Sequence, residues 1–134
     1  MRQILFRGKD TKTKQWRYGY LQFHYVQGRD SNGLVFVGIS RIFDQENNQA
    51  YDVITDTVGQ FTGELDDRGD MIFEGDRVHY QCGDEHSGYR EFSEVLEIKY
   101  VGMEFTLYNN KTGITYSDSM MYAERFIVGD IYES

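Results

Sequence analysis

Asp56-Thr-Val-Gly-Gln-Phe-Thr-Gly-Glu-Leu-Asp-Asp-Arg-Gly-Asp-Met-Ile-Phe-Glu-Gly-Asp-Arg-Val78 is the stretch of sequence that decides the fold. Its aromatic and aliphatic residues predict two short strands, 58–61 and 71–73, joined by a turn over residues 66–70. A second corner, at Glu74-Gly75-Asp76, leads into a third strand that begins at Val78. Tight corners need backbone conformations that glycine adopts easily. We therefore predict a structural role in the corners for Gly59, Gly63, Gly69, Gly75 and Asp76.

The composition outside this stretch also favours β-structure. The chain has 134 residues, enough for one domain with its own core. It contains 11 tyrosines and 9 phenylalanines, which are strand formers, together with 14 glycines and no proline. Its turns must therefore be built from Gly, Asn and Asp.

Short strands alternate with turn-like segments along the whole chain. The apolar runs predict strands at 3–7, 16–26, 34–43, 50–55, 77–82, 92–101, 104–108, 114–116 and 126–132. The run 34–43 is nearly continuous in apolar residues and predicts a buried strand, while residues 117–124 fit a single helical turn. We predict a mainly β protein with an N-terminal antiparallel β-hairpin region at 1–56 and a small barrel at 57–134. Period-two spacing places ten residues in the barrel core: Val58, Phe61, Ile72, Val78, Leu96, Ile98, Phe105, Leu107, Ile127 and Ile131.

Charge and cysteine content limit the possible functions. The net charge is −8, which opposes nucleic-acid binding because such binding depends on Lys and Arg at the phosphates. Six bases do lie in the first 17 residues, and they predict a solvated hairpin surface more readily than a binding patch. One cysteine excludes an internal disulfide, and no apolar run is long enough for a membrane span or a signal peptide. We expect a soluble cytoplasmic protein.

No constellation of residues predicts an enzyme or a cofactor. His79, Cys82 and His86 fall within eight residues, but a structural zinc site normally needs a second pair of ligands, so we predict an ordinary polar loop. The acidic residues around 66–76 lack the ligand alternation of a calcium loop and are expected to be solvated. Neither a nucleophile with a paired base nor a phosphate-binding loop is indicated. The aromatic residues of 16–25 are expected to serve as core or cross-strand pairs.

Five blocks of sequence, in this order and spacing, resemble the YopX family of phage and prophage proteins. The blocks are Ile4-Leu-Phe-Arg-Gly-Lys-Asp10, Trp16-x-Tyr-Gly-Tyr-Leu21, Thr57-Val-Gly-Gln-Phe-Thr-Gly63, Asp70-x-x-Phe-Glu-Gly-Asp-Arg-Val78 and Ile127-Val-Gly-Asp-Ile-Tyr-Glu133. The resemblance implies an SH3-like β-barrel in the second half and a phage or prophage origin, hence a bacterial host cell. It brings no catalytic residues to this chain.

Three functions stay open on the sequence alone. The first is a non-catalytic accessory protein that works by protein–protein contact or as a homo-oligomer. The second is a nucleic-acid-binding protein that uses the barrel and the basic N-terminal hairpin. The third is an acidic inhibitor of a host DNA-binding enzyme, which would need its carboxylates arrayed on one face.

Overall fold

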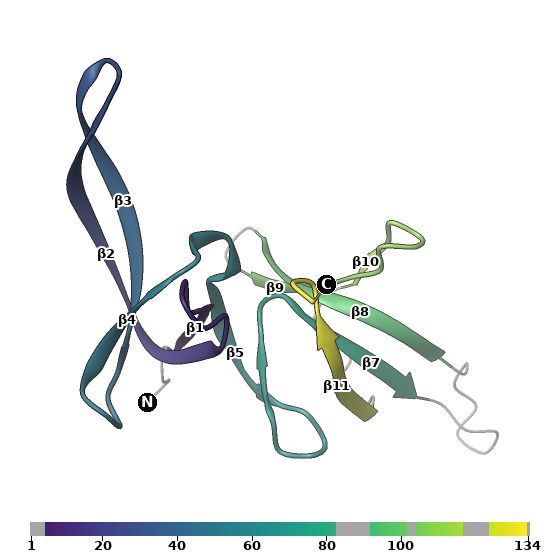
Figure 1. The fold of residues 1–134 in the computed structure, drawn as a ribbon. Coiled ribbons are helices and arrows are strands. Elements are labelled where there is room, and N and C mark those ends of the chain that lie inside the picture. Colours follow the sequence, from purple (N-terminus) through teal and green to yellow (C-terminus); the bar gives the residue numbers. More distant parts are fainter. Residues whose placement is uncertain (1–4, 83–91, 102–103, 117–123, 134) are drawn as a thin grey trace. The chain divides into compact units, whose positions relative to one another are not determined.

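A computed structural model describes residues 5–82, 92–101, 104–116 and 124–133 (Figure 1). Over these residues the chain consists of antiparallel strands, with one short 3₁₀ turn, η1 (Thr55–Thr57), and no α-helix. The mainly β prediction is confirmed. The chain divides into two compact units, residues 1–60 and 61–134, which are described in turn. The predicted helical turn at 117–124 lies almost entirely outside the described residues.

The first unit is a sheet in the order β4-β3-β2-β1-β5. Strand β5 begins in this unit and ends in the second one. The five strands are β1 (Phe6–Lys9), β2 (Trp16–Asp30), β3 (Gly33–Asp44), β4 (Gln49–Val53) and β5 (Gly59–Leu65).

Gly19 is the point where β2 changes partners. Residues 16–19 pair with β1, whereas residues 20–30 pair with β3. Strand β3 approaches β2 so closely here that a Cβ atom at position 19 would lie 1.9 Å from the carbonyl oxygen of Phe43. Only glycine fits at this position, which explains why a strand otherwise rich in aromatic residues is interrupted by one.

The core of the first unit is small and lies at the base of the β2–β3 pair. Ile42 is fully buried and Val53 is 3% exposed. The buried Ser40 hydroxyl lies 2.9 Å from the hydroxyl of Thr55, which ties β3 to η1. The part of the hairpin beyond Ser40 therefore extends past the packed region.

The second unit contains six further strands. The β5–β6 pair precedes a five-stranded antiparallel sheet in the order β10-β9-β8-β7-β11. Over the described residues β11 pairs only with β7 and β10 only with β9, so these strands do not close into a barrel and the SH3-like barrel is not confirmed. The strands are β6 (Met71–Phe73), β7 (Asp76–Cys82), β8 (Phe92–Val101), β9 (Glu104–Tyr108), β10 (Thr115–Tyr116) and β11 (Glu124–Asp130).

The core of the second unit follows the predicted alternation in part. Five of the ten predicted core residues are buried, namely Ile72, Val78, Leu96, Ile98 and Leu107. The other five are only partly buried: Val58, Phe61, Phe105, Ile127 and Ile131. Two further residues, Tyr80 and Phe73, were not predicted to be in the core but are at most 2% exposed. Tyr80 continues the alternation of β7 two positions after Val78, and in β6 the adjacent residues Ile72 and Phe73 are both buried.

The corner at Gly75 joins three segments of the second unit. Gly75 has φ of +93°, its N–H donates to the Ile98 carbonyl and its carbonyl accepts from the Ile131 N–H, both at 2.9 Å. Asp76, 2% exposed, accepts a 2.8 Å hydrogen bond from the Phe73 N–H across the same corner. Gly63 and Gly69 also have positive φ, whereas Gly59 lies buried in β5 opposite Arg7.

Candidate interaction surface

The most conspicuous surface of the first unit is a long two-stranded ribbon formed by β2 and β3. We call residues 22–39 the arm; the ribbon extends from the rest of its unit (Figure 1). Its strands pair residue by residue from Tyr20 opposite Phe43 to Asp30 opposite Gly33. The sequence prediction ended the first strand at Val26 and began the second at Leu34. That prediction was wrong, because only Ser31 and Asn32 form the turn, which the Asp30 carboxylate closes at 2.8 Å from the Asn32 N–H.

None of the residues of the arm is buried. Tyr25 is 73% exposed, Phe36 69% and Phe23 56%, and Leu34 and Val37 are also exposed. The prediction of a buried strand at 34–43 is therefore wrong for residues 34–39. Of the two roles expected for the aromatic residues of 16–25, core or cross-strand pairing, the core role is wrong for Phe23 and Tyr25. An apolar run becomes a buried strand only where another layer covers it, and the described strands of the first unit cover neither face of the arm.

The aromatic side chains gather on one face of the arm. Register and alternation place Phe23, Tyr25 and Phe36 on that face, with Leu34 next to Phe36. The rings of Phe23 and Tyr25 meet edge to face, with centroids 5.8 Å apart. Both lie over Gly38, where a Cβ atom would come within 3.0 Å of the Phe23 ring. We call the side chains of Phe23, Tyr25, Phe36 and Leu34 the aromatic face.

Both edges of the arm are open. Strand β1 pairs with β2 only as far as Gly19, and β4 pairs with β3 only from Ser40 onward. The outward N–H and C=O groups of residues 22–30 and 33–39 therefore have no neighbouring strand over the described residues. A ribbon of two strands is marginally stable in water unless a further strand or layer joins it.

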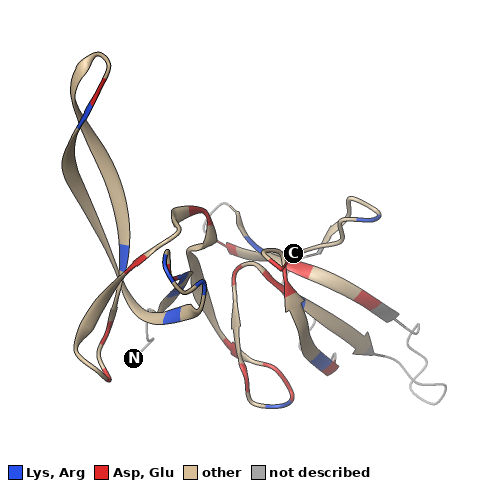
Figure 2. Cartoon of the chain, in the orientation of Figure 1, with Lys and Arg blue, Asp and Glu red and all other residues tan. Residues whose placement is uncertain are grey.

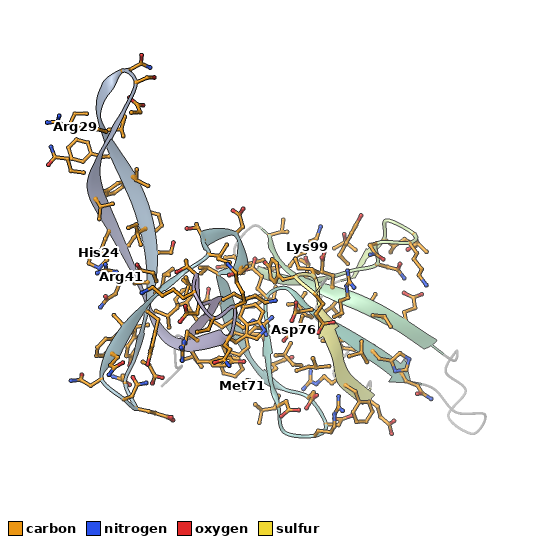
Figure 3. The ribbon with its side chains drawn as sticks, viewed as in Figure 1. His24, Arg29, Arg41, Met71, Asp76 and Lys99 are labelled. Atoms are coloured by element: carbon orange, nitrogen blue, oxygen red, sulfur yellow. The ribbon has the colours of Figure 1, made fainter. Side chains whose placement is uncertain are left out.

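The arm is nearly free of charge on a strongly acidic chain. Its only Lys, Arg, Asp or Glu residues are Arg29 and Asp30, which are adjacent at the tip, so the arm adds nothing to the net charge of −8. Figure 2 shows the ribbon uncoloured between these two residues and Arg41 at its base. In Figure 3 its side chains project outward on both sides, with His24 and Arg29 labelled.

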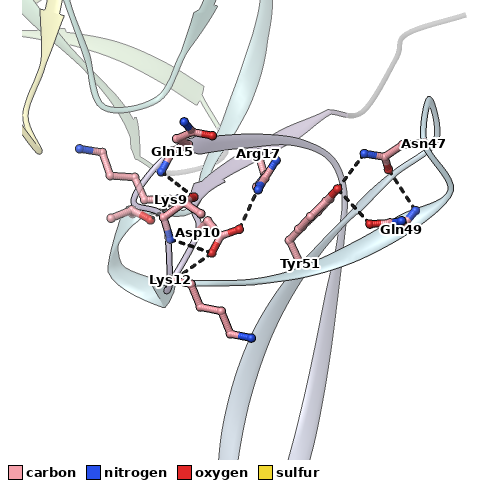
Figure 4. Close-up of polar contacts among 10 residues, drawn as sticks. Lys9, Asp10, Lys12, Gln15, Arg17, Asn47, Gln49 and Tyr51 are labelled. Carbon is pink, nitrogen blue, oxygen red and sulfur yellow. Dashed lines mark hydrogen bonds and ion pairs between the residues drawn. The ribbon is translucent and has the colours of Figure 1, made fainter.

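Three basic residues of the N-terminal hairpin contact aromatic or acidic side chains of the first unit. The Arg7 guanidinium lies 4.1 Å from the centroid of the Trp16 ring, and the Lys9 ammonium lies 5.3 Å from it. Arg17 stacks on the Tyr51 ring at 3.9 Å and binds Asp10 with a 3.0 Å ion pair (Figure 4). These contacts hold the three cations against side chains of the same sheet.

Asp10 organises the turn that follows β1. The Lys12 N–H, which donates to Oδ1 at 2.8 Å, lowers the pKa of the Asp10 carboxyl. Burial acts in the opposite direction, and the Arg17 guanidinium at Oδ2 and the Thr13 N–H lower the pKa further. Asp10 is therefore a structural carboxylate, held ionised by the turn that it closes.

Asp66 plays a similar part in the second unit and was not expected to be buried. Its side chain is completely buried, and its carboxylate accepts hydrogen bonds from the N–H groups of Arg68 and Asp70 in the turn and of Ile127 in β11. Burial raises the pKa of Asp66, but the N–H donors and the Arg68 guanidinium outweigh burial, so the net change is downward. The prediction of solvated acidic residues over 66–76 is wrong at Asp66 and also at Asp76, which is 2% exposed and bonded to the Phe73 N–H.

The turn over residues 66–70 also covers the outer edge of β11. The Asp67 N–H donates to the Arg125 carbonyl at 2.9 Å, and the Arg125 N–H donates back to the Asp67 carboxylate at 2.9 Å. The Arg125 guanidinium pairs with Glu64 at 2.8 Å. Backbone groups that an edge strand would leave open are thus paired with the turn.

The metal and catalytic candidates do not assemble over the described residues. His79 lies in β7 opposite Val95 and Phe126, Cys82 is the last residue of β7, and His86 lies outside the described residues. His24 is on the arm in the other unit. In the part of the chain that the structure describes, no three His, Cys, Asp or Glu side chains are placed to hold a metal ion.

One small hollow lies in the second unit beside its core. It is lined by Thr62, Glu64, Tyr80 and apolar side chains of β6, β8 and β9, and has room for about one water molecule. It is too small for a substrate.

Within the described ranges there is no helix of the length and apolarity that crossing a membrane requires.

These observations define a class of β protein whose most distinctive surface is an exposed apolar arm. The family model described as YopX protein matches residues 5–134, nearly the whole chain. The chain therefore belongs to the YopX family, as the five sequence blocks predicted, and this membership associates it with bacteriophages. No curated protein matches it.

Proposed function

We propose that this protein is a non-catalytic accessory protein of a bacteriophage or prophage that acts by protein–protein contact in the bacterial cytoplasm. The observation that carries the proposal is the arm, which holds three aromatic side chains 56–73% exposed. Exposed apolar patches of this kind mark interaction sites. Family membership supplies the phage context.

The competing functions have less support. Arg7, Lys9 and Arg17 already contact aromatic rings or a carboxylate, so the N-terminal hairpin offers few free cations to nucleic acid. Mimicry of DNA needs exposed carboxylates in an array. Asp10 and Asp66 are instead buried and bonded to backbone N–H groups.

The SH3-like barrel belongs to the proposal as well. In its support, one hydrophobic cluster joins β6, β7, β8 and β9, and the Gly75 corner bonds to both β8 and the residue after β11. A crystal structure that traces the whole chain would test whether the strands close.

The test of the interaction function removes the arm and keeps its base. Replacing residues 24–39 by Asn-Gly joins Phe23 to Ser40, which already face each other in the register, through a turn suited to hairpins. Immobilised wild type and arm-deleted protein are incubated with lysate from cells producing the phage, and the retained proteins are compared. We expect proteins that only the wild type retains. Identical retention by both would contradict the proposal.

A further inference from the structure

We propose that the aromatic face of the arm is the contact between two copies of this chain. The inference rests on the proposed function, since it takes the arm to be a docking surface, and it names the partner. The occupant is a second copy that places its own aromatic face against the first.

The exposed aromatic area is large enough to matter for a dimer. The exposed fractions of Phe23, Tyr25 and Phe36 together amount to about two whole rings, and at ~150–250 Å² for each ring they leave ~300–500 Å² of aromatic surface in water. A stable interface needs ~800 Å² from each partner. Three side chains thus supply about half of that area, and Leu34 and the side chains around them extend it.

The rings are held in place before any partner binds. Phe23 and Tyr25 contact each other edge to face and rest on Gly38, which has no side chain to separate them from the ribbon. Phe36 is diagonal to Tyr25 across the register and continues the surface towards the tip. Preorganised aromatic side chains lose little conformational freedom on binding.

The distribution of charge favours a second copy over a different partner. A chain of net charge −8 repels its own copy wherever two acidic surfaces meet. Between residues 22 and 39 the only charges are Arg29 and Asp30; the register places Arg29 beside Leu34 on the face that carries the aromatic residues and Asp30 on the other face, so this contact surface has no carboxylate of its own. A two-fold contact needs a patch that is complementary to itself, and an aromatic face without carboxylates meets that condition.

The experiment is sedimentation equilibrium over a wide range of concentration. It compares the wild type, a triple variant carrying Phe23→Ser, Tyr25→Ser and Phe36→Ser, and a control, Val128→Ser, which removes a side chain of similar exposure (56%) from β11. We expect a wild-type mass above the 15.8 kDa of one chain. The triple variant should raise the dissociation constant at least ~100-fold, as loss of central aromatic contacts does, and the control should behave like the wild type.

Two results would overturn the inference. One is a wild type that stays at the mass of one chain at every concentration, and the other is an oligomer that the triple variant leaves intact. If the triple variant fails to fold by circular dichroism, the single change Tyr25→Lys at the most exposed ring replaces it, with the same two outcomes. A monomeric wild type whose arm still retains proteins from phage-producing cells would refute the second copy and leave the proposed function standing.

Discussion

Replacing Asp66 by asparagine should destabilise the second unit far more than its small change in shape would indicate. The Asp66 carboxylate is fully buried and accepts three backbone N–H groups at 2.9–3.1 Å. Asparagine keeps one oxygen for the two donors of its own turn, but turns an NH₂ group towards the Ile127 N–H. One buried donor would then face another donor.

The cost follows from these contacts. A hydrogen bond to a charged group contributes ~1.5–3 kcal/mol against ~0.5–1.5 kcal/mol for a neutral one, and an unsatisfied buried N–H costs ~1–3 kcal/mol. Two weakened bonds and one orphaned donor therefore lower the free energy of unfolding by about 3 kcal/mol or more. The matched control is Asp70→Asn, which removes the same charge from an exposed side chain of the same turn and should change stability by less than ~0.5 kcal/mol.

The dependence on pH gives a second readout. The pKa of Asp66 is lower in the folded protein than the ~3.9 of a free aspartate, so its stabilising contribution is complete above that value. The contribution is lost as the pH falls through the lower folded pKa. The stability difference between wild type and Asp66→Asn should therefore shrink in acid.

The measurements are urea unfolding of the three proteins at neutral and acidic pH, and hydrogen exchange of the Asp70 and Ile127 N–H groups. Exchange at both sites should accelerate in Asp66→Asn and stay unchanged in Asp70→Asn. A loss below ~1 kcal/mol at neutral pH, or equal losses in the two variants, would refute the reasoning.

The remaining predictions concern other positions. Gly75→Ala should lower the free energy of unfolding in urea by about 1 kcal/mol or more, because φ is +93° and the new Cβ would lie 3.0 Å from the Tyr132 ring. The control Gly69→Ala, where φ is +87° and the space is open, should lower it less. Equal losses in the two variants would show that the contact with Tyr132 does not matter. Ile42→Ala should cost ~2–5 kcal/mol and the exposed Leu34→Ala less than ~0.5 kcal/mol, and similar losses would show that the packed region extends into the arm. Chelator should leave the thermal unfolding midpoint unchanged, and stoichiometric zinc with loss of fold in His79→Ala would overturn the absence of a structural metal.

Turn chemistry and alternation were enough to predict most of the strands. Gly75 at its corner and five buried residues of the second core follow from period-two spacing and from the needs of tight turns. These features depend on near neighbours in the chain, which is why the sequence shows them.

The sequence misled where the outcome depends on distant partners. The apolar run of β3 has the composition of a buried strand, but burial requires a covering layer, and composition does not reveal whether one exists. Asp66 looks like a solvated turn residue because one of its donors, Ile127, is 61 positions further along the chain. The sequence did not locate the candidate interaction surface either, because composition does not show that β2 and β3 are left uncovered.

The cover that the 66–70 turn places over β11 has a consequence for synthesis of the chain. Strand β11 also pairs with β7. Until residues 124–130 have been made, the turn and one edge of β7 therefore lack the strand with which they pair in the folded protein. Contacts of such long sequence separation form late in folding. A nascent chain therefore carries an open strand edge until residues 124–130 have been made, and unpaired strand edges are prone to aggregate. Loss of β11 should accordingly be more damaging in the cell than loss of the whole arm.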